Sequence, residues 1–168
     1  RLPVSTYRKQ RRGGVGVTGM ETKEEDFVEH LFIASTHDYI LFFTDRGRVH
    51  WLKVHEIPRA GRYSKGRAII NILQLAEGET VTAFLDVKSF DDGKYVMMAT
   101  EKGIVKKTEL EAFSNPRAGG IIAIGLDEGD RLTHVVLTSG DDEILLGTAH
   151  GLAIRFHERQ IRPMGRTA

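Results

Sequence analysis

A basic, glycine-rich segment near the start of the chain has the residue types that bind phosphate. It spans Gln10–Gly16 and directly follows a pair of cations. Arginine and lysine supply charge and hydrogen-bond donors for phosphate oxygens. Glycines let the backbone approach closely and expose its N–H groups. The segment predicts a contact with a nucleic-acid backbone, although on its own a flexible basic linker is equally compatible. The candidate residues are Arg8, Lys9, Gln10, Arg11, Arg12, Gly13, Gly14 and Gly16.

Weaker copies of this pattern occur at residues 62–67, 115–120 and 162–166. For each copy alone, a turn that needs glycine for its geometry is the simpler interpretation. Their recurrence at regular positions favours a second interpretation, in which basic loops line one edge of the fold. The candidate DNA-binding residues in these loops are Arg62, Lys65, Arg67, Arg117, Arg162 and Arg166.

Charge alternates along the chain although the net charge is only +1. Residues 1–20 carry five Lys or Arg and no acid, and residues 46–67 carry seven against one acid. Residues 127–143 instead carry six acids against one arginine. This alternation is compatible with random surface charge. It also fits a fold that returns repeatedly to one basic, anion-binding edge.

The other side chains predict no catalytic residue and no metal site. The seven histidines form no tight ligand motif, and their spread fits strand positions better than a metal centre. Cysteine is absent, which excludes disulfides and thiolate sites. No apolar run approaches the length of a membrane span. The chain does not begin with Met, so we expect it to be part of a longer protein.

An ungapped internal repeat predicts how these loops are positioned. Residues 39–49, 95–105 and 143–153 each contain a short apolar run, a turn with glycine, and a second strand-like segment. The turn glycines are Gly47, Gly103 and Gly151, separated by 56 and 48 residues. Apolar runs around a glycine that can adopt positive φ are typical of β-hairpins. We therefore expect three equivalent hairpins.

A second repeated element links the hairpins. Residues 77–85 and 128–136 each combine an acidic turn with a strand-like segment rich in Thr and Val. By position, residues 25–33 are the first copy. Helix propensity alone would allow an amphipathic helix there, but the two later copies favour a strand.

The repeat predicts an all-β fold made of propeller-like blades. A period of about 50 residues with about four antiparallel strands per unit is typical of such blades. We expect one repeat domain over 1–168, with blade units at 1–60, 61–114 and 115–163 and the start of another at 164–168. About three blades imply an open arc, part of a larger ring, or assembly with other blades. Exposed strand edges also predict a tendency to associate.

With these loops and this repeat, the sequence resembles the C-terminal domain of the DNA gyrase A subunit over essentially the whole chain. Residues Gln10–Gly16 match that family's box, Gln-Arg-Arg-Gly-Gly-Lys-Gly, at six of seven positions. Residues 22–28 and 41–47 are also similar to the family's first blade. Val15 departs from the family's lysine or arginine and removes one charge that could pair with phosphate.

The resemblance implies a β-pinwheel in which neighbouring blades exchange strands, with this chain as about the first half of a domain of about six blades. It implies binding and wrapping of double-stranded DNA around a basic perimeter, in support of ATP-dependent negative supercoiling. Cleavage, ATP and Mg²⁺ would belong to other parts of a type II DNA topoisomerase, an isomerase of the bacterial cytoplasm. The implied partners are the gyrase B subunit, in an A2B2 complex, together with the N-terminal domain of the gyrase A subunit.

Two other functions remain open at the sequence level. The A subunit of topoisomerase IV has a similar domain that generally lacks an intact box. A propeller can also serve as a scaffold for protein interactions, in which case the basic residues would have no role in DNA binding.

Overall fold

The computed structural model describes residues 1–28 and 30–168, and it is all-β as predicted. Short 3₁₀ turns are its only helical elements in these ranges. The strands are β1 (Tyr39–Thr44), β2 (Arg48–Lys53), β3 (Val81–Val87), β4 (Tyr95–Thr100), β5 (Val105–Glu109), β6 (Ile121–Ile122), β7 (Leu132–Thr138), β8 (Glu143–Gly147) and β9 (Ala153–His157). The 3₁₀ turns are η1 (Val4–Thr6), η2 (Val54–Glu56), η3 (Ile69–Asn71), η4 (Leu110–Phe113) and η5 (Glu158–Gln160).

The three predicted hairpins are confirmed. β1 pairs with β2, β4 with β5, and β8 with β9, all antiparallel. Their registers are equivalent, since the first residue of each hairpin lies opposite the last. Each turn contains a glycine with positive φ, as Gly47, Gly103 and Gly151 show. The repeat in the sequence is therefore a repeat of one hairpin geometry.

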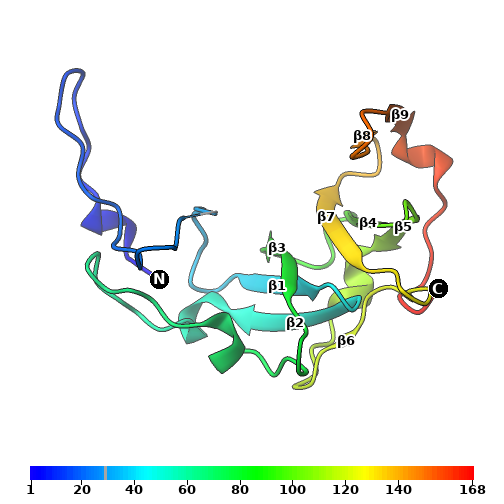
Figure 1. The fold of residues 1–168 in the computed structure, drawn as a ribbon, viewed down its shortest axis with the longest axis horizontal. Coiled ribbons are helices and arrows are strands. Elements are labelled where there is room, and N and C mark those ends of the chain that lie inside the picture. The colour runs from blue at the N-terminus through cyan, green and yellow to red at the C-terminus, as the bar shows by residue number, and fades with distance from the viewer. Residues whose placement is uncertain (29) are drawn as a thin grey trace.

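Neighbouring repeats exchange strands. β3 pairs with β1 and β7 pairs with β4, so the first and second hairpins each receive a strand from the sequence that follows them. β6 completes a sheet of order β3-β1-β2-β6, beside sheets β5-β4-β7 and β8-β9. Figure 1 shows these elements as an open arc between the N-terminal loop and the β8–β9 hairpin. The unit boundaries at 60/61 and 114/115 stay a prediction, because strand pairing crosses them.

The strand predicted over residues 25–33 is wrong for the residues that the structure describes there. Residues 25–28 and 30–33 belong to no strand, and Glu29 lies outside the described residues. The equivalent segments β3 and β7 pair with the hairpin that precedes them, whereas residues 1–24 contain no hairpin. Aromatic ring contacts instead hold this segment against β3. The ring centre of Phe84 lies 4.9 Å from that of His30 and 4.8 Å from that of Phe32.

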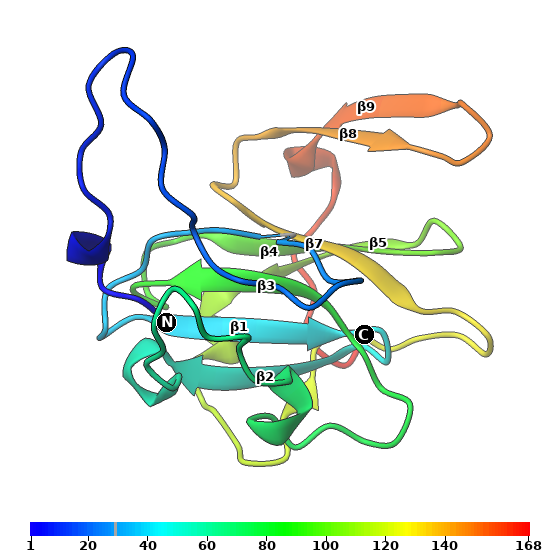
Figure 2. The same cartoon turned by 60° about the vertical axis from the view of Figure 1, so that its left-hand side comes forward.

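Two hydrophobic clusters cover both faces of β1, which explains its unbroken apolar sequence. Leu41 and Phe43 face a cluster shared with β4, η4 and β7. Ile40 and Phe42 face a second cluster that includes Leu73. A strand buried on both faces needs apolar residues at consecutive positions. The β8–β9 hairpin lies apart from these clusters and extends away from the other sheets (Figure 2).

The equivalent turn glycines provide a matched stability test. Both Gly47 and Gly103 have positive φ, but a Cβ on Gly47 would lie 2.7 Å from the Ile124 carbonyl oxygen, whereas one on Gly103 would meet nothing within 4 Å. We expect Gly103→Ala to cost about 1–2 kcal/mol through backbone strain. Gly47→Ala is expected to cost roughly 1–3 kcal/mol more, because the backbone of residue 124 must move. Urea unfolding of both variants measures the difference, and equal midpoints would contradict it.

Candidate nucleic-acid interface

The N-terminal basic loop stands clear of the sheets (Figure 1). All of residues 8–16 are exposed. A turn forms at its tip, where Gly14 N–H donates to the Arg11 carbonyl at 2.9 Å and Gly13 has a φ of +80°. The Gln10 side-chain amide is oriented so that its nitrogen donates to the Val15 carbonyl and its oxygen accepts from the Arg8 guanidinium, both at 3.2 Å. The guanidinium groups at the tip are thus presented to solvent on a defined turn.

The second basic loop lies against the base of the first. The Tyr7 hydroxyl donates to the Gly19 carbonyl at 2.8 Å and closes this base. Glu21 N–H donates to the Arg62 carbonyl at 2.9 Å, and the Arg62 guanidinium donates to the Thr18 carbonyl at 3.4 Å. The chain that returns from the first loop, at residues 18 and 21, therefore contacts the second loop at Arg62.

The third basic loop follows β5 and η4 and is anchored on β2. The Arg48 guanidinium donates to the Gly119 carbonyl at 2.6 Å and to the Gly120 carbonyl at 3.3 Å. Arg117 lines the same surface cavity as Gln74, which belongs to the segment that continues from residues 62–67. This cavity therefore places the third loop next to the chain that leaves the second.

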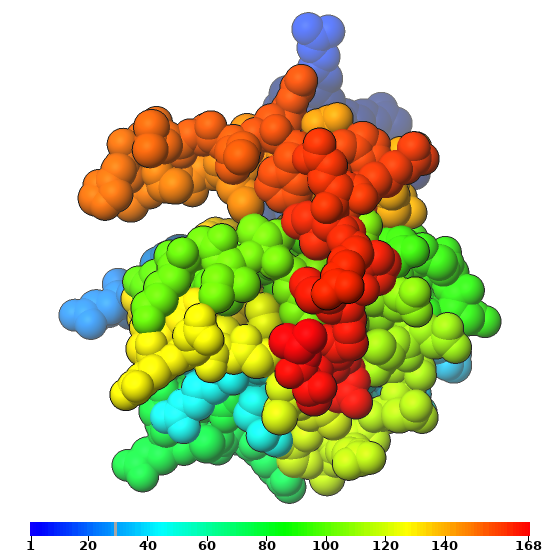
Figure 3. All heavy atoms as spheres, turned by 90° about the vertical axis from the view of Figure 1, so that its right-hand side faces the viewer, coloured from blue at the N-terminus to red at the C-terminus, as the bar shows by residue number. Residues whose placement is uncertain are grey.

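The fourth basic loop lies next to the chain that continues from the third. Arg166 donates from its guanidinium to the Ile122 carbonyl at 3.1 Å, and Gly125 N–H donates to the Ala168 carbonyl at 3.2 Å. Figure 3 shows this C-terminal segment lying across the surface of earlier residues. The contacts and the shared cavity therefore join segments that flank the four basic loops, which are residues 8–16, 62–67, 115–120 and 162–166.

The cations of the four basic loops are available to bind an anion. Eight of the ten are exposed, and only Arg62 and Arg166 are half-buried. Across residues 1–28 and 30–168, none of the ten forms an ion pair with a carboxylate. The ion-paired lysines and arginines in those ranges lie outside the loops, at Lys94, Lys107, Arg131, Arg155 and Arg159.

Arg59 is a further exposed cation near the second basic loop that the sequence motifs missed. It is exposed three residues before the second basic loop, and no partner is found for it within the described chain. The signal that could have found it is the basic run at residues 46–67, because no glycine motif marks its position.

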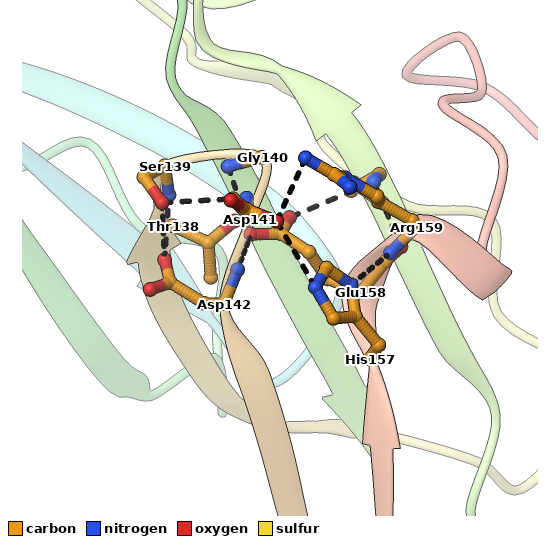
Figure 4. A network of polar contacts seen from close by, with 9 residues as sticks. Thr138, Ser139, Gly140, Asp141, Asp142, His157, Glu158 and Arg159 are labelled. Carbon is orange, nitrogen blue, oxygen red and sulfur yellow. Dashed lines mark hydrogen bonds and ion pairs between the residues drawn. The ribbon is translucent and has the colours of Figure 1, made fainter.

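Asp141 and Glu158 are in contact with side chains and backbone groups close to them in the fold (Figure 4). Asp141 contacts His157 at 3.0 Å and Arg159 at 2.9 Å. Glu158 is fully buried and accepts hydrogen bonds from the Thr138 hydroxyl and the backbone N–H groups of residues 140 and 142. These two acids therefore stabilise the turn between β7 and β8 and its junction with η5.

Lys106 is buried between Ala123 and the C-terminal segment that carries the fourth basic loop. Its ammonium donates to the carbonyls of Ala123 at 3.1 Å and Ala168 at 2.9 Å, and it also bonds the Arg166 carbonyl. Burial, followed by the charge of Arg166, lowers the pKa of Lys106 from 10.5 to about 8. The neighbouring residue has a different environment: the Lys107 ammonium lies 3.6 Å from the Glu158 carboxylate and 4.8 Å from the Tyr95 ring centre.

The lowered pKa of Lys106 predicts an alkaline gain in stability. Because its folded pKa lies below the ordinary value, the unfolded chain binds more protons between pH 8 and 10.5. The free energy of unfolding should therefore rise through this window, by at most about 3 kcal/mol. Urea unfolding at pH 7.5 and at pH 10 measures this rise in the wild-type chain. The Lys106→Met variant is the control, and its free energy of unfolding should not rise in the same way. An equal pH dependence in both proteins would contradict the assignment.

No group of three or more metal-binding side chains is found among the described residues. The helices found there are all too short to span a bilayer.

A family model described as "DNA gyrase C-terminal domain, beta-propeller" matches residues 1–35, 38–88, 94–139 and 142–168. The chain is 51% identical over 168 residues to the DNA gyrase A subunit of Halalkalibacterium halodurans and 49% identical over 168 residues to that of Clostridium acetobutylicum. It is 51% identical over 166 residues to that of Klebsiella oxytoca. These alignments cover 99–100% of this chain and 19–20% of the relatives, so the chain spans about a fifth of their length.

Solved structures of two C-terminal domains share the fold. The C-terminal domain of DNA topoisomerase IV matches with a TM-score of 0.73 and 31% identity, over 79% of this chain and 42% of that one. A DNA gyrase A C-terminal domain matches with a TM-score of 0.66 over 98% of this chain and 53% of that one. At 21% identity, the second match is evidence for the fold alone.

Proposed function

The chain belongs to the DNA gyrase C-terminal domain family, and from this premise we propose that it binds duplex DNA along its four basic loops. The observation that carries the proposal is the set of ten loop cations without a carboxylate partner in the described chain, on loops that contact segments flanking one another. Arginine, lysine and exposed backbone N–H groups contact phosphates without reading the base sequence. The described elements include no helix long enough to enter a major groove, which favours backbone contacts.

The arrangement also supports bending of the bound duplex. The loops follow one another along an arc, so a duplex that touches all four must curve. Bending a short site costs on the order of 1–6 kcal/mol, and several phosphate contacts are needed to offset this cost. We propose that this wrapping supports negative supercoiling by an ATP-dependent gyrase. The catalytic residues, ATP and Mg²⁺ then belong to the B subunit or to the rest of the A subunit.

Salt-dependent binding of a duplex tests the proposal. Each phosphate contact contributes about −0.9 to the slope of log affinity against log salt concentration. Contacts from all four loops predict a slope steeper than about −3.6, and the ten cations limit it to about −9. Labels at the two duplex ends should also move closer together on binding. A slope near zero, or binding without any change in end-to-end distance, would overturn the proposal.

A role in topoisomerase IV is the second candidate, because the C-terminal domain of that enzyme shares the fold at 31% identity. The nearly complete box at Gln10–Gly16 favours gyrase. A supercoiling assay on the complete enzyme separates the two candidates. Replacing Arg11 and Arg12 by alanine should abolish the introduction of negative supercoils but not ATP-dependent relaxation if the enzyme is a gyrase. Unchanged supercoiling in this variant would contradict the gyrase assignment.

A further inference from the structure

The third basic loop is held by a hairpin that is not its neighbour in the sequence. Arg48 begins β2 of the first hairpin, and its guanidinium donates to the carbonyls of Gly119 and Gly120 at 2.6 and 3.3 Å. The loop itself follows the second hairpin. One side chain of the first hairpin therefore fixes the end of a loop that lies 71 residues further along the chain.

The backbone of this loop also lies directly against β2. Gly120 N–H donates to the Arg117 carbonyl at 2.8 Å and closes a turn, in which Gly120 has a φ of +70°. A Cβ on Gly120 would lie 2.8 Å from the Val49 carbonyl oxygen. Arg117 is the one cation of residues 115–120, and it is exposed. The turn that carries this cation is therefore positioned by Arg48 and by the close approach of Gly120 to β2.

The next junction repeats this arrangement with a different cation. Lys106 lies on β5 of the second hairpin, and its ammonium donates to the carbonyls of Ala123 and Arg166. Arg166 belongs to the fourth basic loop, which follows the third hairpin. The third and fourth basic loops are thus each held by a cation from the hairpin that precedes the one they follow.

The two anchoring cations occupy different positions of the repeat. Arg48 is equivalent to Ile104, because the backbone N–H of each donates to the threonine hydroxyl four residues earlier. Lys106 is equivalent to His50, because the two residues have equivalent pairing positions in their hairpins. Residues two apart in a strand lie on the same face of the sheet. The anchoring cation thus comes from either of two positions on one face.

We propose that Arg48 is a positioning residue for DNA binding, which does not touch the duplex but holds the third basic loop so that Arg117 reaches a phosphate. This inference rests on the proposed function. A loop that is ordered before binding avoids the entropic cost of becoming ordered on the duplex. The loss of Arg48 should therefore weaken binding only through Arg117.

A double-mutant cycle separates this role from a direct phosphate contact. Arg117→Ala removes one contact, so the affinity should fall about eightfold at 0.1 M salt and the salt slope should become shallower by about 0.9. Arg48→Ile should lose most of the same contact, with an affinity about fourfold to eightfold lower. The double variant should bind no more weakly than Arg117→Ala alone. A double variant whose loss is the product of the two single losses overturns the proposal.

The second junction supplies a design for rescue. Adding His50→Lys to Arg48→Ile recreates the pair formed by Ile104 and Lys106. The relocated ammonium should restore the affinity to within about twofold of the wild type. A direct phosphate contact by Arg48 would not be replaced in this way, because position 50 is buried.

The matched control is Arg46→Met. The Arg46 guanidinium also donates to a backbone carbonyl at 2.6 Å, but this carbonyl belongs to Glu77, outside the basic loops. Its loss should change the affinity by less than about twofold, since charges away from the bound phosphates are screened by salt. A loss as large as that of Arg48→Ile would mean that net charge is the cause, and it would overturn the proposal.

Hydrogen exchange without DNA makes the test independent of the proposed function. In Arg48→Ile, the Gly120 N–H should exchange at least about tenfold faster than in the wild type, because its turn opens more often. The Gly103 N–H, which bonds the Thr100 carbonyl in the second hairpin, should be unchanged. Unchanged exchange at Gly120 overturns the positioning role even where DNA binds. Faster exchange together with an Arg117→Ala variant that binds as tightly as the wild type would instead overturn the DNA contact of Arg117.

Discussion

Replacing Arg11 and Arg12 by alanine should weaken duplex binding on the order of 60-fold at 0.1 M salt. The two guanidinium groups lie at the exposed tip of the first basic loop and have no carboxylate partner in the described chain. Each lost phosphate contact removes about 0.9 from the salt slope, so the slope should become shallower by about 1.8. Fluorescence anisotropy of a labelled duplex over a series of salt concentrations measures both quantities.

The control for this prediction replaces two arginines that lie outside the basic loops, so that the same amount of positive charge is lost. Arg131 and Arg159 are exposed, but they pair with Glu101 and Asp141 at 2.7 and 2.9 Å. Alanine at these two positions should change the affinity by less than about threefold, because these cations are not available to phosphates. Equal losses in both double variants would mean that net charge, and not the loop, determines binding. No loss in either would favour the protein-scaffold function.

Replacing Lys107 by methionine should lower the free energy of unfolding by about 3–5 kcal/mol, because it leaves a buried carboxylate without its cation. The Lys107 ammonium donates to the Glu158 carbonyl at 2.8 Å, and both side chains are almost fully buried. The pair joins the second hairpin to the turn after the third. Urea unfolding measures the loss, and a change below about 1 kcal/mol would contradict it.

A second substitution should recover at least half of that loss. Glu158→Gln removes the buried charge but keeps an acceptor for the N–H groups of Gly140 and Asp142, which both donate to one carboxylate oxygen. The amide nitrogen of Gln can donate to the Thr138 hydroxyl, which now bonds the other oxygen. The double variant should therefore be more stable than Lys107→Met alone. If it is less stable, the charge of Glu158 is not the cause of the loss.

The sequence predicts the hairpins well because their determinants are local. Each turn glycine adopts positive φ, and each apolar run becomes a first strand. The error at residues 25–33 has a different cause, because a strand of this type exists only where a neighbouring hairpin offers an edge. Its sequence is equivalent to β3 and β7, but residues 1–24 form no strand with which it could pair.

The site could be predicted as a set of loops but not as a surface. Charge and glycine mark each basic loop, whereas the contacts that join the loops run between distant residues such as Arg62 and Thr18 or Arg166 and Ile122. The buried pair formed by Lys107 and Glu158 was also not foreseen, because both residue types are normally exposed. Aligning the repeats would have given a signal, since Glu158 occupies the position of Leu110.

Footprinting of arginine and lysine side chains with and without a bound duplex tests the central claim most directly. If one duplex follows the connected loops, protection should appear together at residues 8–12, 62–67, 117 and 162–166. The ion-paired Arg131 and Arg155 should stay equally reactive in both states. Protection confined to a single loop, or protection of the ion-paired arginines instead, would contradict the account.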